Sequence, residues 1–433
     1  MSHNQFITDI LNIKEDLIKE IFTIKQPSGD LIIKIKLVLT PSICPCCGNQ
    51  ANIHGYIKRK LVHSILVDKP CCIIYQQRRF KCKRCSFTFS EKNPFASPHG
   101  NMSHATKINI LRALKSYHTT YTDAAERFNV SKQSVLRLFD KHVNIPRKQL
   151  PAVLSIDEHY FPNSDRDALY CCVLMDFLTG EILDLLPDRR KKYLGNYFSE
   201  IKAQSFNYKT LTSELSIVQY ISIDLYDNYR DVAKMYFPKA VICADSFHVI
   251  KNLMDCFSKV RLRCRTGTED PYLKYLLTHF KYIFRHEQFL DNEPRYNKYF
   301  RRYMNLRDFR DYLFQLFPDL EIAYNLKEFY IMFNENCIEE KARTSFEEVV
   351  NKFANSGIEE YDPFYRLLLN WQEEIINSFK IVNSRRINNS FIESKNRLIG
   401  KLIENANGFT NFKRTRNRIL YCLNPNDTYT FLF

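Results

Sequence analysis

Apolar residues recur along the chain at two different periods, and the changes of period divide it into segments of different fold class. From about residue 103 to 143 they fall at helical spacing, which predicts three short helices. Two of these, at 121–128 and 131–139, are separated by a two-residue turn, and Ser131 is the expected N-cap of the second. This pattern predicts a helix-turn-helix.

Short apolar runs follow, separated by helical segments, which is typical of an α/β domain. The predicted elements are strands at 152–156, 169–175 and 182–186, a helix at 192–206, a strand at 217–223, a helix at 229–237 and a strand at 240–244. The order β-β-β-α-β-α-β is that of the ribonuclease H-like arrangement, in which acidic residues at strand ends meet at one edge of a mixed sheet. Fold analogy alone does not establish chemistry.

Between about 260 and 377 the apolar and aromatic residues return to helical spacing. The stretch is too long for one sheet-to-helix connection, so we expect an α-helical insertion within the α/β domain. Its aromatic residues are expected to form core rather than a base-stacking surface.

Composition favours a polyanionic partner. The 433 residues include 63 Lys and Arg against 48 Asp and Glu, a formal net charge of +15. Such an excess favours nucleic acid or an anionic membrane. The longest apolar runs fall far short of the roughly 20 residues that span a bilayer, and acidic residues interrupt the N-terminal region where a signal peptide would be apolar. We therefore expect a cytoplasmic protein that makes no membrane contact.

Two Cys-x-x-Cys pairs predict a zinc ribbon. They are Cys44 with Cys47 and Cys82 with Cys85, and the second pair begins 35 positions after Cys47. Zn²⁺ prefers four tetrahedral thiolates, and a two-residue spacer lets both sulfurs of a tight turn reach one ion. Cys46 could replace Cys44 only by removing its spacer, so it is expected to lie outside the site. In a reducing compartment the other cysteines are expected to pack as small apolar side chains.

Several polar side chains are suited to DNA. In a helix-turn-helix the N-terminal residues of the second helix enter the major groove. The corresponding donors here are Lys132, Gln133, Ser134 and Arg137. Around the second cysteine pair, a basic cluster could contact phosphates, although a solvated basic face is the alternative; its members are Arg78, Arg79, Lys81, Lys83 and Arg84.

Carboxylates follow the predicted strands. Asp157 follows the first strand and Asp224 the fourth, and Asp245 follows the last strand and is a rival to Asp224. Cleavage and transfer of phosphodiesters by two Mg²⁺ ions about 3.5–4 Å apart needs acidic oxygens that hold both ions. A third acid should come from a helix on the same sheet, and Glu393, at the start of a basic helical segment, is the best candidate.

The order of these features resembles a known family. The motifs are SIDEH at 155–159, SIDLYDNY at 222–229, ADSFHVIKNL at 244–253 and NNSFIESKNRLIGKLIENANGFTNFKRTRNRIL at 388–420. Together with the zinc ribbon and the helix-turn-helix, they look like the bacterial insertion-sequence transposases of the ISL-three family. The resemblance covers nearly the whole chain, from about residue 32 to 423.

The resemblance implies a DDE transposase whose acids match Asp157, Asp224 and Glu393, which would hold two Mg²⁺ (or Mn²⁺) ions. The element formed by Asp245 and His248 resembles a motif of related transposases and is expected near the site, with its role open. The family commonly has glycines after the asparagine and the last acid of this block, where this chain has Ser390 and Ser394. This departure concerns loop geometry more than the acid itself.

The resulting fold prediction is a multidomain α/β protein. Its expected parts are an N-terminal segment (1–40), a zinc ribbon (41–98), a helix-turn-helix domain (99–147), a ribonuclease H-like catalytic domain (150–260) interrupted by a helical insertion (261–377), and the last part of the catalytic domain with a basic C-terminal helix (378–433).

The expected function is that of a transposase, which binds the terminal inverted repeats of its mobile element, cleaves the element ends and joins them to target DNA. Pairing of two ends favours a homodimer or larger assembly. Basic residues of the last segment are expected to contact DNA, namely Lys395, Arg397, Lys401, Lys413, Arg414, Arg416 and Arg418. Two alternatives remain at this stage. One is a DNA-binding regulator with a catalytically silent domain, and the other is a nuclease or resolvase without strand transfer.

Overall fold

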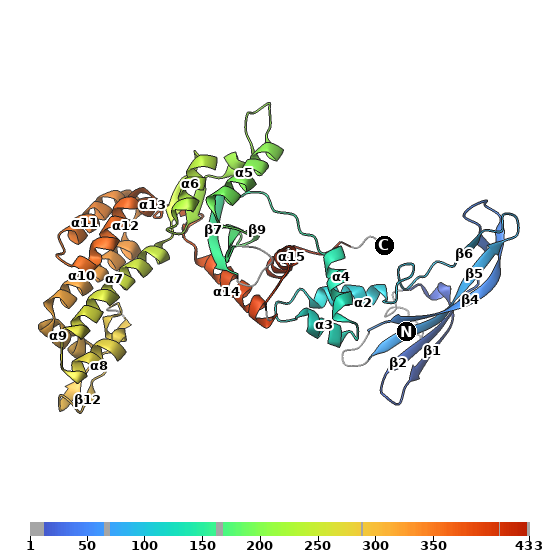
Figure 1. Cartoon of the computed structure of the whole chain (residues 1–433), viewed down its shortest axis with the longest axis horizontal. Coiled ribbons are helices and arrows are strands. Elements are labelled where there is room, and N and C mark those ends of the chain that lie inside the picture. The colour runs from blue at the N-terminus through green and yellow to red at the C-terminus, as the bar shows by residue number, and fades with distance from the viewer. Residues whose placement is uncertain (1–12, 65–69, 162–167, 287–288, 407, 431–433) are drawn as a thin grey trace. The chain divides into compact units, whose positions relative to one another are not determined.

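The computed structural model describes residues 13–64, 70–161, 168–286, 289–406 and 408–430 (Figure 1). The chain forms two compact units. The first contains the N-terminal residues up to Pro146 and the C-terminal residues from Arg397, and the second contains most of the residues between them. Across the described residues, no helix combines the length and the apolar character needed to cross a membrane.

The first unit contains a six-stranded sheet. Its strands are β1 (Ile18–Lys25), β2 (Leu31–Leu37), β3 (Ser42–Ile43), β4 (Gln50–Val62), β5 (Cys71–Cys82) and β6 (Thr88–Ser90). The order is β1-β2-β5-β4-β3, with β6 paired to β5, and β2 and β5 run parallel. One face is covered by an apolar core that includes Ile33, Ile73 and Tyr75. The predicted N-terminal segment and the cysteine-bearing hairpin β4–β5 therefore belong to one sheet.

Four helices complete the first unit: α2 (His104–Ala113), α3 (Tyr121–Arg127), α4 (Lys132–His142) and α15 (Phe412–Leu423). The predicted helices at 121–128 and 131–139 are confirmed as α3 and α4, and the Ser131 hydroxyl accepts the Ser134 N–H as an N-cap. The turn between them places Asn129 at φ +51°, a conformation that asparagine tolerates better than most residues. Helix α15 packs on these helices, since the Tyr421 hydroxyl donates to Leu111 O.

The second unit contains a five-stranded sheet. Its elements in chain order are β7 (Val153–Tyr160), β8 (Tyr170–Asp176), β9 (Ile182–Leu186), α5 (Lys191–Ser205), β10 (Tyr220–Ile223), α6 (Asp227–Tyr236) and β11 (Val241–Ala244). The sheet order is β11-β10-β7-β8-β9, in which β7, β8 and β9 are antiparallel neighbours and β10 is parallel to both β7 and β11. The predicted succession of strands and helices is therefore confirmed, and the fold class is mixed α/β.

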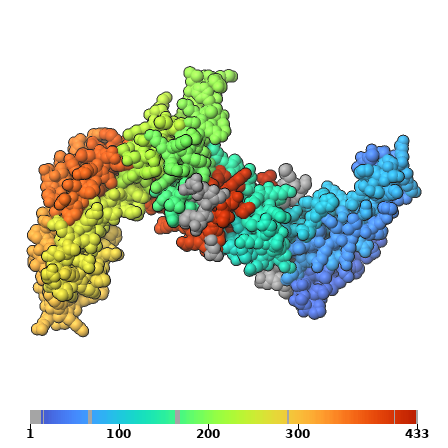
Figure 2. Space-filling model, viewed as in Figure 1, coloured from blue at the N-terminus to red at the C-terminus, as the bar shows by residue number. Residues whose placement is uncertain are grey.

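Helices fill the segment after β11. They are α7 (Ser246–Thr266), α8 (Pro271–His279), α9 (Leu306–Leu316), α10 (Pro318–Asn336), α11 (Ala342–Ala354), α12 (Asp362–Asn370) and α13 (Gln372–Asn377). The yellow-to-orange segments gather into one body (Figure 2). One continuous apolar core runs from the sheet through α7 to these helices, from Leu154 to Trp371 and Phe379. A small hairpin, β12 (Arg295–Asn297) with β13 (Arg302–Met304), was not predicted.

The chain returns to the sheet through a second short hairpin, β14 (Ile381–Val382) with β15 (Arg385–Arg386), and then forms α14 (Ser390–Asn405). The boundary between the two units falls inside α14, between Asn396 and Arg397. Residues at the beginning of α14 therefore belong with the sheet of the second unit.

Candidate active site

Three aspartates directly follow three residues that are paired with one another across neighbouring strands of the second sheet. Ile223 of β10 is in register with Ile156 of β7 on one side and Ala244 of β11 on the other. Each of these residues is followed directly by an acid, namely Asp157, Asp224 and Asp245. Because all three strands are parallel, the acids come together at one edge of the sheet, where all are at least nine-tenths buried.

Asp157 lies within a strand rather than after one. The prediction that the strand ends at Ile156 was wrong, because β7 continues to Tyr160 and pairs with β8 throughout. Burial, and secondarily the charge and hydrogen bond of Asp224, raise the pKa of Asp157 to about 9. Two buried carboxylates this close cannot both ionise readily without a nearby positive charge.

Asp224 and Asp245 share a histidine. The Nδ1 atom of His248 lies 3.1 Å from Asp224 Oδ1 and 3.0 Å from Asp245 Oδ2. Burial alone would lower the pKa of His248, but its hydrogen bonds to these two carboxylates raise it to about 10. Asp224 therefore lies between Asp157 on one side and the Asp245–His248 pair on the other.

Two asparagines of the following segment hold the three acids. Asn389, fully buried, donates from its backbone N–H to Asp245 Oδ1 (2.9 Å) and from Nδ2 to Asp224 Oδ1 (3.0 Å). Asn396 donates from Nδ2 to Asp157 Oδ2 (2.7 Å). Sequence reasoning gave these asparagines no role, although Asn389 directly precedes α14 and Asn396 lies in its second turn.

Glu393 lies between them in the helical repeat. Asn389 directly precedes α14 and its carbonyl oxygen accepts the Glu393 N–H (3.0 Å), and Glu393 and Asn396, three residues apart, share one helix face. Because Asn389 and Asn396 both contact the aspartates, this face of α14 is the one directed toward the acid row. The third predicted acid thus comes from the face of α14 that covers the other two.

The serines that replace glycines leave the backbone unstrained. The positive-φ residues of the described chain include Asn383 and Ser384 in the β14–β15 turn, but neither Ser390 nor Ser394. Ser390 begins α14 and Ser394 is inside it. Since both have ordinary helical backbone, glycine is not required at either position.

Arg189 contacts segments next to the row of aspartates. Arg189 forms an ion pair with Glu158, the neighbour of Asp157. Its guanidinium also lies over the rings of Tyr170 (4.2 Å) and Tyr226 (4.7 Å). These contacts join β7, β8 and the segment after β10, and they hold the backbone that carries Asp157 and Asp224.

The donor set fits a hard divalent cation. Asp224, Asp245 and His248 each place a ligand atom within 4.8 Å of the others, and Asp157 follows the residue of β7 that is paired with the residue before Asp224. Moreover, the Oδ1 atoms of Asn389 and Asn396 are buried and have no hydrogen-bond partner among the described residues. Carboxylate and amide oxygens are the ligands that Mg²⁺ and Mn²⁺ prefer, and a cation would offset the repulsion between the acids.

The four predicted cysteines form a second candidate metal site in the first unit. The ligand atoms of Cys44, Cys47, Cys82 and Cys85 lie within 4.8 Å of one another, with Sγ–Sγ distances of 3.6 Å for Cys44–Cys85 and 3.5 Å for Cys47–Cys82. Four thiolates about 2.3 Å from one Zn²⁺ would lie at similar separations. Cys46 is exposed and outside the cluster, as expected.

Both cysteine turns have the same backbone form. The Gly48 N–H donates to Cys44 O and the Ser86 N–H to Cys82 O, and both donors have positive φ. Hydrogen bonds from the backbone and side chain of Asn49 lower the pKa of Cys47 to about 6, which favours the thiolate. The cluster is therefore suited to a structural zinc ion.

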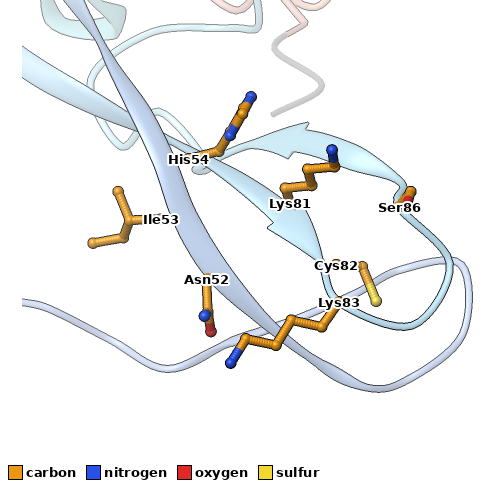
Figure 3. Close-up of a pocket in the computed structure, with 7 residues that line it drawn as sticks. All are labelled: Asn52, Ile53, His54, Lys81, Cys82, Lys83 and Ser86. Atoms are coloured by element: carbon orange, nitrogen blue, oxygen red, sulfur yellow. The ribbon is translucent and has the colours of Figure 1, made fainter.

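A shallow hollow lies beside the second cysteine turn. Figure 3 shows Lys81, Lys83 and His54 around it, with Cys82 at its edge. Arg79 is exposed, in contrast to Arg78, which is 6% exposed. The Arg78 guanidinium donates to Glu91 and to Val38 O, so it is held by protein groups and does not belong to the exposed basic surface.

The other predicted DNA-contacting residues differ in their exposure and in their hydrogen bonds. Lys132, Gln133 and Arg137 are exposed on α4, whereas the Ser134 hydroxyl is hydrogen-bonded to that of Ser131. On α14, Arg397 and Lys401 are exposed, and burial lowers the pKa of Lys395.

The prediction that the arginines of α15 contact DNA has to be corrected, because all three are held by protein groups. Arg414 pairs with Asp140, Arg416 donates to Ile145 O, and the buried Arg418 donates to Ser116 O and Thr119 O. Lys413 is exposed. Much of the positive charge of this helix therefore stabilises the helix-turn-helix.

A family comparison adds to this geometry. A family model described as a transposase, of the DDE ISL3 type, matches residues 154–419, which is more than half of the chain. The matched region begins in β7, beside Asp157, and ends in α15, so it includes all the candidate acids. No curated protein matches the sequence.

Proposed function

The chain belongs to the ISL3 family of transposases, and from this membership and the acid row we propose that it binds the terminal inverted repeats of an insertion sequence, cleaves the element ends and transfers them into target DNA. The observation that carries the proposal is the convergence of Asp157, Asp224 and the Glu393 face of α14. The sheet order and the placement of these acids support a ribonuclease H-like catalytic domain.

The proposed metal ligands are Asp157, Asp224 and Glu393. Two Mg²⁺ or Mn²⁺ ions held there would activate the attacking oxygen and stabilise the leaving oxygen. Asn389 and Asn396 orient the aspartates, and Asp245 fixes His248 against Asp224. Water first attacks a phosphodiester at the element end and releases a 3′-hydroxyl; this hydroxyl then attacks a target phosphodiester and displaces a target 3′-oxygen.

DNA contacts are proposed on three surfaces. The exposed donors of α4 would face base edges and phosphates in the major groove. Arg79, Lys81 and Lys83 near the cysteine turn would contact the phosphate backbone. Arg397 and Lys401 are exposed donors on α14, the helix that contains Glu393.

The decisive experiment compares the wild-type chain with Asp157→Asn on labelled element ends in the presence of Mg²⁺. The DNA flanking the gene supplies the substrate, since matched inverted repeats there define the ends. We expect Asp157→Asn to abolish cleavage and leave end binding intact, because the substitution removes a metal-binding charge but no DNA contact. Retained cleavage in this variant would disprove the assignment.

Product analysis separates the proposed reaction from its alternatives. A transposase yields both nicked ends and products joined to target DNA, and two ends must be held together, so at least two copies are expected on DNA. Cleavage without joined product would identify a nuclease. Tight binding without either product would identify a regulator.

A further inference from the structure

The open face of the first sheet carries four lysines that none of the surfaces above includes. They form a compact array, called here the lysine face, whose members are Lys34 and Lys36 of β2 and Lys58 and Lys60 of β4. All four are exposed. The opposite face of the same strands carries the core residues Ile33, Ile35 and Leu61, so the lysines lie on the side opposite this core.

Strand register places the lysines in two rows. In the first row, Ile74 of β5 is paired with Lys34 on one side and Lys60 on the other. In the second row, Gln76 is paired with Lys58 and lies one position beyond the Ile35–Tyr75 pair, so it is next to Lys36. Strand spacing then puts the four Cα atoms at the corners of a rectangle of roughly 7 by 10 Å.

The charge of this array is largely uncompensated. Within the described residues, Lys36 pairs with Glu20 at 3.0 Å, and Lys34, Lys58 and Lys60 have no acidic partner within ion-pair distance. At these separations, which are comparable to the Debye length of about 8–10 Å, the ammonium groups repel one another. Neighbouring like charges on a sheet reduce stability, so the fold gains nothing by placing them together.

Protection of sheet edges does not account for the whole array. Lysines often prevent edge strands from pairing with other chains. However, β2 lies between β1 and β5, so Lys34 and Lys36 are not on an edge strand. Among the described residues β3 pairs with β4 only at Gln50 and Ala51, so Lys58 and Lys60 lie where the outer side of β4 is unpaired. Edge protection therefore explains at most the two lysines of β4 and leaves those of β2 unexplained.

We infer that the lysine face binds the phosphate backbone of duplex DNA. This inference rests on the proposed function for its choice of polyanion, and charge complementarity supports it: four positive charges and one negative charge lie on a surface of the same unit that contains α4. The face makes no base-specific contact of its own; it adds affinity and sets the register of the helix-turn-helix on DNA.

Substitution of one exposed aromatic residue, Phe22, tests whether the ligand is duplex or single-stranded DNA. Phe22 is 57% exposed and is paired with Lys34 in the first row. Single strands stack their bases on aromatic rings of this kind, whereas a duplex keeps its bases paired. With duplex DNA as the ligand, Phe22→Ala leaves binding nearly unchanged. A loss confined to single-stranded DNA would reassign the face to single strands.

The test measures binding of a random-sequence duplex by the full-length protein at several salt concentrations. Replacing all four lysines by glutamine should lower the affinity by about 10- to 100-fold and reduce the slope of log K against log salt by about 0.9 for each phosphate that the variant no longer neutralises. A variant with the four lysines replaced by arginine keeps the charge and should bind like the wild-type chain. Thermal melting confirms that each variant is folded.

The matched control replaces Lys192, Lys202, Lys209 and Lys239, four exposed lysines of the second unit, by glutamine. It changes net charge equally and should leave the slope unaltered. An unchanged slope in the lysine-face variant, or an equal loss in the control, would overturn the inference. Because the readout is binding, a wild-type chain that fails to cleave DNA would disprove the proposed catalysis and leave this test intact.

Discussion

Asn396 Nδ2 donates a hydrogen bond of 2.7 Å to Asp157 Oδ2, which joins α14 to β7 inside the candidate active site. The same amide donates to the Glu158 carbonyl oxygen at 3.2 Å. Because Glu393 precedes Asn396 by less than one helical turn, this contact fixes both the orientation of the first acid and the position of the third. Asn396 is therefore a positioning residue for two of the proposed metal ligands.

Replacing Asn396 by alanine should reduce the rate of end cleavage by about 10- to 100-fold, the usual cost of losing a group that orients a metal ligand. DNA affinity should stay within about twofold, because the side chain is directed at Asp157 rather than at a basic surface. Single-turnover cleavage of labelled ends, with affinity measured separately, checks both expectations.

Asn405→Ala is the matched control for this change. Asn405 lies on the same helix, and among the described residues its side chain makes one long contact, of 3.5 Å, to the Tyr117 carbonyl oxygen. It should cleave at the wild-type rate. If both variants were impaired equally, damage to α14 rather than misplacement of Asp157 would be the cause.

Asp224 and Asp245 should differ in their response to the loss of charge. Asp245 is 1% exposed, and its two oxygens already accept bonds from the Asn389 N–H and His248 Nδ1. We therefore expect Asp224→Asn to abolish measurable Mn²⁺ binding, and Asp245→Asn to weaken it by about 10- to 100-fold while keeping the stoichiometry.

Calorimetric titration with Mn²⁺ in the absence of DNA measures this difference without relying on activity. Asp227→Asn serves as the control, because its side chain is exposed and, in the part of the chain that the structure describes, its ion pair is with Arg230. Should Asp245→Asn change the stoichiometry and Asp224→Asn leave it intact, the roles of the two acids would have to be exchanged.

In protein free of Mg²⁺, Asp157→Asn should raise the melting temperature. Burial first, and Asp224 second, raise the pKa of Asp157 from 3.8 to about 9, so the charged form is disfavoured in the folded state. The folded state then binds more protons than the unfolded state between these values, and stability falls as pH rises through this window. At pH 7 the neutral amide should add at least about 1 kcal/mol to the free energy of unfolding.

Scanning calorimetry at pH 5, 7 and 8 checks the sign. The gain from Asp157→Asn should be larger at pH 8 than at pH 5, and Mg²⁺ should reduce it by stabilising the wild-type chain alone. A stability gain that shrinks as pH rises would mean that Asp157 is stabilised as a carboxylate in the folded protein.

Much of this site could be predicted from the sequence, because its determinants are local. The alternation of strands and helices predicted that Asp157, Asp224 and Asp245 follow neighbouring strands. The parallel register of these strands then brings the three acids to one edge of the sheet. The cluster of four cysteines was predictable for the same reason, since each pair occupies a single turn.

Other features depend on contacts between distant segments. Neither the buried ion pair that removes Arg78 from the basic surface nor the packing of α15 on the helix-turn-helix has a local signal. The extent of β7 was also underestimated, because pairing with β8 extends the strand through polar residues that interrupt its apolar run. Long-range pairing overrides local pattern at such positions.

Zinc content should depend on Cys47 but not on Cys46. Removing one of four thiolates leaves an incomplete tetrahedral site, so Cys47→Ser should lose bound zinc and loosen the β4–β5 hairpin, whose two ends the cluster joins. Cys46→Ser, one position away and exposed, should retain one zinc per chain. Elemental analysis and limited proteolysis of the hairpin report the two effects, and equal zinc in both variants would contradict the four-cysteine assignment.

Arg418 should matter for the stability of the first unit rather than for DNA contact. Its side chain is buried, donates to Ser116 O and Thr119 O, and contacts Cys422 Sγ, so it joins α15 to the loop between α2 and α3. Lysine cannot reproduce this planar fork, and Arg418→Lys should cost about 2–4 kcal/mol by leaving carbonyl groups unpaired.

Thermal melting of Arg418→Lys and of Lys413→Gln, an exposed change on the same helix, separates the two roles. Arg418→Lys should melt several degrees lower and bind DNA normally when folded, because its charge is kept and its contacts are internal. Lys413→Gln should melt like the wild-type chain. A different outcome is that Arg418→Lys melts normally and binds DNA more weakly. The guanidinium of Arg418 in the wild-type chain would then contact phosphate instead of its carbonyl partners, and α15 would be a DNA-binding helix.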